Sequence, residues 1–152
     1  MARTKIDPSL IPTLTIGFQA PVQGTSTTEF TTTATSFQTT NCAATITPTS
    51  SSHRIKITVS GFLRTATSQS ANSYVTIARS TTNLGTAQGF GALLYASAAD
   101  TSAGALVSFI YIDSPATASS TTYNVQIRSD VGGKTVGFGQ QGTQVIVLEE
   151  IV

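Results

Sequence analysis

The feature that most constrains the fold of this chain is the alternation of apolar and polar residues in several short segments. In 54–60, three apolar residues alternate with charged or hydroxyl-bearing residues, and 73–79 and 121–129 repeat the pattern. A period of two places the apolar side chains on one face of a β-strand. No window of about 11 residues or more shows the apolar spacing of an amphipathic helix. The pattern therefore predicts an all-β protein.

Further segments complete the set of predicted strands. Residues 105–112 and 145–148 are apolar on both faces, which is typical of strands buried in a sandwich or against a neighbouring subunit. Gly61 is a candidate for a bulge or a bend. Weaker strands are expected at 14–18, 28–33, 35–40, 43–47, 90–95 and 134–138. About eight to ten short antiparallel strands, separated by turn-forming residues, predict a jelly-roll-like β-sandwich.

The composition favours sheet over disorder. The 152 residues include 28 Thr and 18 Ser, nearly a third of the chain. A mucin-like or disordered stalk would combine such a content with many prolines and few patterned apolar residues, but there are only 5 prolines. Because Thr is β-branched and common in strands, the hydroxyl content supports the β prediction.

The chain is predicted to divide into an extended N-terminal arm, 1–22, and a jelly-roll β-sandwich domain, 23–152. Pro8, Pro12 and Pro21 exclude a regular helix or a central strand in the arm, yet the arm is too apolar for a solvated tail. It would bury its apolar residues on the surface of a neighbouring protein, or alternatively on its own domain. The candidate assembly contacts are Arg3, Lys5, Ile6, Leu10, Ile11, Leu14, Ile16 and Phe18.

The charges are few and balanced. Eight basic and seven acidic residues give a formal net charge of +1. Nucleic-acid binders and polybasic membrane-surface segments concentrate Lys and Arg, so neither partner is expected. No apolar run approaches the roughly 20 residues that cross a bilayer. The single cysteine, Cys42, forms no intrachain disulfide, which fits folding in a reducing cytoplasm.

No residue set predicts catalysis, cofactor binding or a metal site. His53 is the only histidine, and a catalytic base would also need an orienting carboxylate and a nucleophile. A loop residue before a strand is the simpler interpretation of His53. Asp100, Asp113 and Asp130 fit turns, and residues 149–150, both Glu, would point to opposite faces of a strand. One Cys and one His exclude a Cys/His zinc site within one chain.

Three sequence runs carry a resemblance to a known family. Residues 46–55, ITPTSSSHRI, are similar to the run ITPTSSSSKI of a family of small β-rich bacteriophage virion proteins. Residues 113–115, DSP, followed by 120–125, STTYNV, resemble that family's segment DSPxxxxTTYxV, and the ending 147–151 resembles its C-terminal strand. The resemblance covers roughly 25–152 and rests on turn and strand signatures; His-Arg replaces the family's usual Ser-Lys.

The resemblance implies a homotrimeric jelly-roll module on the outside of a phage particle, made in the host cytoplasm. We expect a capsid decoration, or cement, protein whose arm contacts the major capsid protein or other virion proteins. The alternative is a tail-fibre or receptor-binding tip that recognises host surface glycans through loops such as 68–72 and 96–104. A carbohydrate-active enzyme is disfavoured because the sequence has no clustered carboxylates.

Overall fold

The computed structural model describes residues 19–66, 71–90, 94–96 and 103–152. Within these residues every regular element is a β-strand, which confirms the all-β prediction. The strands are β1 (Val22–Ser26), β2 (Phe30–Thr32), β3 (Gln38–Ile46), β4 (Arg54–Thr65), β5 (Ala71–Arg79), β6 (Thr82–Asn83), β7 (Leu94–Ala96), β8 (Ala103–Asp113), β9 (Thr121–Ser129), β10 (Val136–Phe138) and β11 (Gln144–Ile151). These eleven strands exceed the expected eight to ten. The count includes β2, β6, β7 and β10, which have only two or three residues each.

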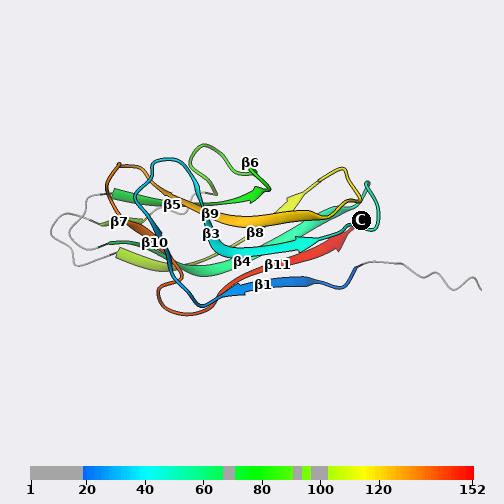
Figure 1. The fold of residues 1–152 in the computed structure, drawn as a ribbon, viewed down its shortest axis with the longest axis horizontal. Helices are drawn as coiled ribbons and strands as arrows, with labels where there is room; N and C mark the ends of the chain where they lie inside the picture. The colour runs from blue at the N-terminus through cyan, green and yellow to red at the C-terminus, as the bar shows by residue number, and fades with distance from the viewer. Residues whose placement is uncertain (1–18, 67–70, 91–93, 97–102) are drawn as a thin grey trace, which may run out of the picture.

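The strands form two antiparallel sheets that pack face to face as a β-sandwich (Figure 1). The first, sheet A, has the order β1-β11-β4-β10-β2, and β8 also pairs with β4. The second, sheet B, has the order β3-β9-β5-β6, and β7 also pairs with β5. The 12-residue strand β4 therefore lies at the centre of sheet A, between β8 on one side and β11 and β10 on the other.

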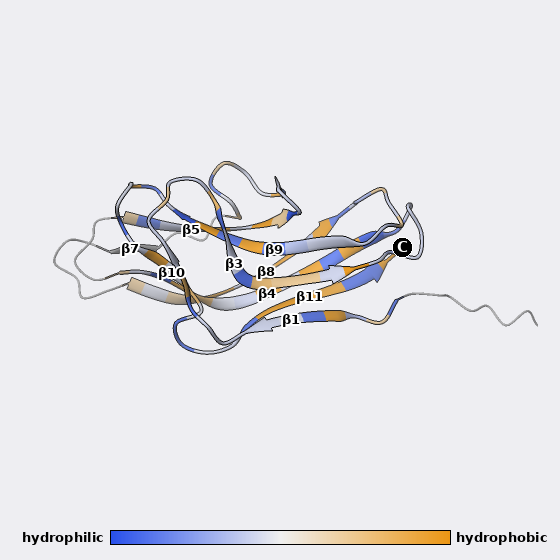
Figure 2. Ribbon diagram, in the orientation of Figure 1, coloured by the Kyte–Doolittle hydropathy of each residue, from blue (hydrophilic) through white to orange (hydrophobic). Residues whose placement is uncertain are grey.

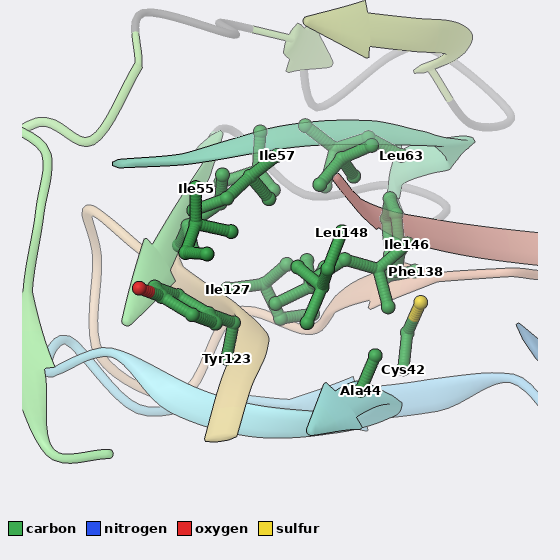
Figure 3. Packing of buried hydrophobic residues seen from close by; sticks show 14 of the residues in the cluster. Cys42, Ala44, Ile55, Ile57, Leu63, Tyr123, Ile127, Phe138, Ile146 and Leu148 are labelled. Atoms are coloured by element: carbon green, nitrogen blue, oxygen red, sulfur yellow. The ribbon is translucent and has the colours of Figure 1, made fainter. Parts of the chain in front are cut away.

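The alternation seen in the sequence places the core between the sheets. Ile55, Ile57 and Val59 of β4 are fully buried, while the residues between them are partly exposed. Figure 2 shows the resulting alternation of apolar and polar residues along the strands. The close-up in Figure 3 shows side chains of β4, β10 and β11 meeting those of β3 and β9. Cys42 belongs to this core and has a free, buried thiol.

The expected bulge at Gly61 is wrong. Strand β4 runs through Gly61 without a shift in its pairing with β8. A Cβ at this position would lie 2.3 Å from Cζ of Phe138, whose ring is fully buried. The close packing of the Phe138 ring therefore requires glycine at position 61.

The irregularity falls in β3 instead. The two expected strands at 35–40 and 43–47 form the single strand β3, whose register against β9 shifts between Thr39 and Ala43. The break that the sequence suggests is thus a β-bulge or similar irregularity within one strand.

Strand β1 was not predicted, because its sequence VQGTS carries a single large apolar residue. Val22 already pairs with Leu148 of β11, so the sheet begins one residue before the expected domain boundary. Pro21 immediately precedes this strand, which lies at an edge of sheet A, a position that proline tolerates.

Candidate assembly surface

Strand β8 is a long edge strand. It pairs with β4 along all of its 11 residues, and none of the described strands pairs with its other edge. Val107, Phe109 and Tyr111 alternate inward and pack against the core. The phenyl ring of Phe90 stacks on that of Phe109, with 5.2 Å between the ring centroids. The inward side of β8 is therefore held by the sandwich.

The outward side of β8 is apolar and open. Leu106, Ile110 and Ile112 have 73%, 61% and 47% of their surface exposed. Elsewhere in the described residues, only Val131 and Val152 are exposed large hydrophobic residues. The expectation that both faces of the strand at 105–112 are buried within the sandwich is wrong. Burial of its outward face against a neighbouring subunit stays a prediction.

The neighbouring strands extend this apolar surface. Phe62 of β4 lies opposite Leu106, and a Cβ at Gly104 would lie 2.5 Å from the Phe62 ring, so the ring lies over β8. One cross-strand row joins Ile110 of β8 to Thr58 of β4 and to Val147 of β11. We call this surface the β8 face; its apolar residues are Phe62, Leu106, Ile110, Ile112, Val145 and Val147.

Two of the charged side chains beside the β8 face form ion pairs. Lys56 lies directly opposite Ile112 and its Nζ is 2.6 Å from Glu149 Oε2, and Arg64 donates to the carboxylate of Glu29. Arg54, at the start of β4, donates to the main-chain oxygen of Val152. Residues 103–112 include no charged residue and no proline, the two kinds that usually prevent association at an edge strand. The β8 face is thus both neutral and open to association.

The predicted contact residues of the arm, from Arg3 to Phe18, all lie outside the described residues. Gln19 is the first described residue of the predicted arm, and it contacts the domain. Its backbone N–H donates to Glu150 Oε2 at 2.9 Å, and its side-chain Oε1 accepts from Thr47 N–H at 3.1 Å. Gln19 is therefore tied to β11 and to the segment that follows β3.

Glu150 is a buried carboxylate that joins three segments. Its side chain is fully buried, and Oε1 accepts hydrogen bonds from the N–H of Thr49 (2.6 Å) and the hydroxyl of Thr49 (2.8 Å). Nδ1 of His53 lies 2.8 Å from the same oxygen. Burial alone would raise the pKa of Glu150, but the hydrogen bonds from Gln19, His53 and Thr49 lower it to about 2. We call this arrangement the Glu150 clasp.

The Glu150 clasp brings a hydroxyl, an imidazole and a carboxylate together without the geometry of a catalytic triad. Thr49 Oγ1 lies 3.2 Å from His53 Nδ1, the same nitrogen that contacts Glu150. In a triad, the carboxylate and the nucleophile contact different ring nitrogens, so that one holds the ring while the other exchanges a proton. The Thr49 hydroxyl instead donates to Glu150, which makes the cluster a structural tie.

The prediction that Asp113 is a turn residue is wrong. Asp113 ends β8, is buried, and accepts from Arg79 Nη1 through both oxygens, at 3.1 and 2.9 Å. The hydroxyl of the fully buried Tyr123 donates to Asp113 Oδ2 at 2.7 Å. Burial, followed by the bond to Asp113, raises the pKa of Tyr123 far above its ordinary range. Of the other two aspartates that were predicted to lie in turns, Asp130 accepts from the backbone of Asn72, and Asp100 lies outside the described residues.

The described part of the chain contains no group of three His, Cys, Asp or Glu residues that could hold a metal ion. It also contains no helix long and apolar enough to cross a membrane. No protein-family model matches the sequence, and no curated protein matches it. The β8 face is the most distinctive surface of the described residues, and it is the basis of the functional conclusion.

Proposed function

We propose that this chain is a non-enzymatic structural protein of a bacteriophage virion: a capsid decoration protein that binds the outer surface of the shell as a homotrimer. The single observation that carries the proposal is the β8 face, an apolar and neutral surface on the open edge of a charge-poor protein. Exposed large apolar residues that cluster on one strand mark an interaction site rather than random surface composition. The trimer and the virion location come from the sequence resemblance.

The occupant of the β8 face is a second copy of this chain. Each Leu or Ile side chain that is fully buried contributes roughly 1.5–3 kcal/mol, and Leu106, Ile110 and Ile112 each keep about half or more of their surface exposed. Lys56 and Arg64 beside them are each paired with a carboxylate and so offer little net charge to an oppositely charged partner. Three copies of the same neutral, apolar face can pack around a threefold axis, where each face is covered by those of its two partners, and closed symmetric association of identical chains is the commonest form of oligomer.

The strand order supports the jelly-roll form of the sandwich. In sheet A, β1, β11, β4 and β8 are neighbours in that order, and β3, β9, β5 and β6 are neighbours in sheet B. Consecutive long strands thus alternate between the sheets for most of the chain. That interleaving is what two nested Greek keys produce in a jelly roll.

The assembly step is tested with one charged substitution on the β8 face. Leu106→Lys places a charge in the proposed interface, so sedimentation equilibrium of the full chain is expected to show trimers for the wild type and monomers for the variant. Val131→Lys is the matched control, because Val131 is also an exposed apolar residue but is not part of the β8 face. A wild type that stays monomeric at concentrations well above micromolar, or trimers that survive Leu106→Lys, would show that the β8 face is not the interface.

The virion role is tested on particles. Phage particles stripped of this protein are expected to lose heat and salt tolerance and to regain them when the trimer is added back; unchanged tolerance would exclude a cement role. The alternative, a fibre or receptor-binding tip, predicts only a few trimers per particle, whereas decoration predicts hundreds, so quantitative mass spectrometry of whole particles separates the two. The loop at 96–104, on which the alternative partly depends, lies largely outside the described residues, as do residues 68–70 of the other loop.

A further inference from the structure

A polar hollow lies away from the β8 face, between the turn joining β5 to β6 and the loop joining β8 to β9. Its volume is about 480 Å³, within the range of roughly 300–1,000 Å³ that small-molecule sites occupy. Seven of its nine lining residues carry a hydroxyl group, and the other two are Arg79 and Pro115. The proposed assembly through the β8 face does not involve this hollow.

Both turns that border the hollow contain a residue in an unfavourable backbone conformation. Among the described non-glycine residues, only Ser80 and Ala116 have positive φ, 54° in each case. Ser80 lines the hollow, and Ala116 lies between two residues that line it. The Ser80 backbone is held on both sides: its N–H donates to Thr122 O (2.8 Å), and its carbonyl accepts from Asn124 Nδ2 (3.0 Å). Non-glycine residues in the left-handed backbone conformation cost free energy, and they concentrate at functional sites.

The hollow offers hydrogen-bonding groups that the fold does not use. Within the described part of the chain, the hydroxyl groups of Ser80, Thr81, Thr82 and Ser120 make no hydrogen bond to another residue. Arg79 binds Asp113 and the carbonyl of Ser114 through Nη1 alone. The N–H groups of Nε and Nη2 are therefore available to a ligand. The site can therefore donate and accept several hydrogen bonds at once.

The charge of the hollow limits the ligand class. Arg79 is the only charged lining residue, and the buried carboxylate beneath it, Asp113, neutralises it through two contacts. A strongly anionic ligand would gain little from such a pair, whereas a neutral molecule rich in hydroxyl groups matches both the guanidinium donors and the Ser and Thr hydroxyls. Pro115 supplies a small apolar contact for the carbon face of a ring.

We propose that this hollow binds a neutral saccharide of one or two sugar rings. The site is independent of the trimer interface, since its residues lie on other elements than the β8 face. A protein on the outside of a particle would thereby gain a contact with glycans, whether it decorates the capsid or ends a fibre.

The test begins with the full-length protein on a printed array of neutral and acidic glycans. The neutral saccharide that binds best is then titrated in solution into ¹⁵N-labelled protein, so that the dissociation constant of a single site is measured without avidity. Ser120→Trp fills the hollow from an exposed position. Ser119→Trp is the matched control, because Ser119 is also exposed and adjacent but does not line the hollow.

Ser120→Trp is expected to weaken binding at least about tenfold by occupying ligand space, while Ser119→Trp leaves it within about twofold. Amide shifts of Thr81, Thr82 and Ser120 should follow the titration. Absence of binding to every neutral glycan, binding restricted to acidic glycans, or equal affinity of the two variants would each overturn the proposal. Leu106→Lys is expected to abolish trimers without changing the single-site affinity, so failure of the assembly proposal and failure of this one are distinguishable.

Discussion

The Glu150 clasp makes a quantitative prediction about stability. Glu150→Gln removes the negative charge from a fully buried group that receives hydrogen bonds from Gln19, Thr49 and His53. The pKa of Glu150 is lowered from 4.5 to about 2 in the folded protein. Since one pKa unit corresponds to about 1.4 kcal/mol, ionised Glu150 stabilises the fold by at most about 3 kcal/mol.

The pH dependence follows from the direction of that change. Because the folded-state pKa of Glu150 is lowered, its contribution is complete above the unfolded-state value of about 4.5. It is lost as the pH falls through the folded-state value of about 2, and only below that value is the carboxyl group protonated in both states. The wild type should therefore lose up to about 3 kcal/mol of stability between about pH 5 and pH 2 that the Glu150→Gln variant does not lose. The difference in stability between the two proteins should therefore fall to a small part of its neutral-pH value at pH 2.

The assay is urea unfolding followed by circular dichroism at one fixed protein concentration, because any association of the chain would contribute to its apparent stability. Glu149→Gln is the matched control: Glu149 is the adjacent residue, but it pairs with Lys56 while both side chains remain more than a third exposed. Such surface pairs contribute roughly 0–1 kcal/mol. If Glu150→Gln were no more destabilising at pH 7 than Glu149→Gln, or if its effect did not shrink on acidification, the clasp would not stabilise the fold as described.

Three further predictions concern the core. Gly61→Ala should destabilise the protein by about 1–3 kcal/mol, because its Cβ would lie 2.3 Å from the Phe138 ring. In the same unfolding assay Gly132→Ala, whose nearest neighbour is 3.9 Å away, should change little; equal effects would contradict the packing argument. Burial raises the pKa of Cys42 to about 11, so its thiol should react with a chromogenic disulfide reagent at pH 8 only after unfolding; rapid reaction of the folded protein would refute this. Tyr123→Phe should cost about 1–3 kcal/mol in thermal unfolding by leaving a buried carboxylate with one donor fewer; an unchanged melting temperature would refute it.

The strands with strict alternation could be predicted well from the sequence. Strand β9 has the expected bounds, 121–129, and β4 contains the expected 54–60, because a period-two pattern leaves only one way to bury the apolar side chains. The prediction that residues 149 and 150 point to opposite faces is also confirmed: Glu149 pairs with Lys56 at the surface, and Glu150 is buried. Local periodicity thus determines which side of a strand is inside.

The features that were missed depend on pairing between distant segments. Strand β1 is recognisable only through its partner β11, more than a hundred residues later, since its own sequence has no clear pattern. The role of Asp113 depends on Arg79 and Tyr123, which come from two other strands. The polar hollow is formed by two turns that lie close together only in the folded sandwich, so no local sequence signal could have located it.

The position of Gln19 has a consequence for the order of events during biogenesis. Gln19 is fixed by Glu150 of β11 and by Thr47, and the strand that follows it, β1, forms only when β11 is in place beside β4. Such long-range pairing is late and slow in folding because loop closure precedes it. The segment before Gln19 is therefore anchored to the domain only when the domain has almost finished folding. If that segment attaches the protein to a shell, incompletely folded subunits would be excluded from the particle by the same contacts that finish the fold.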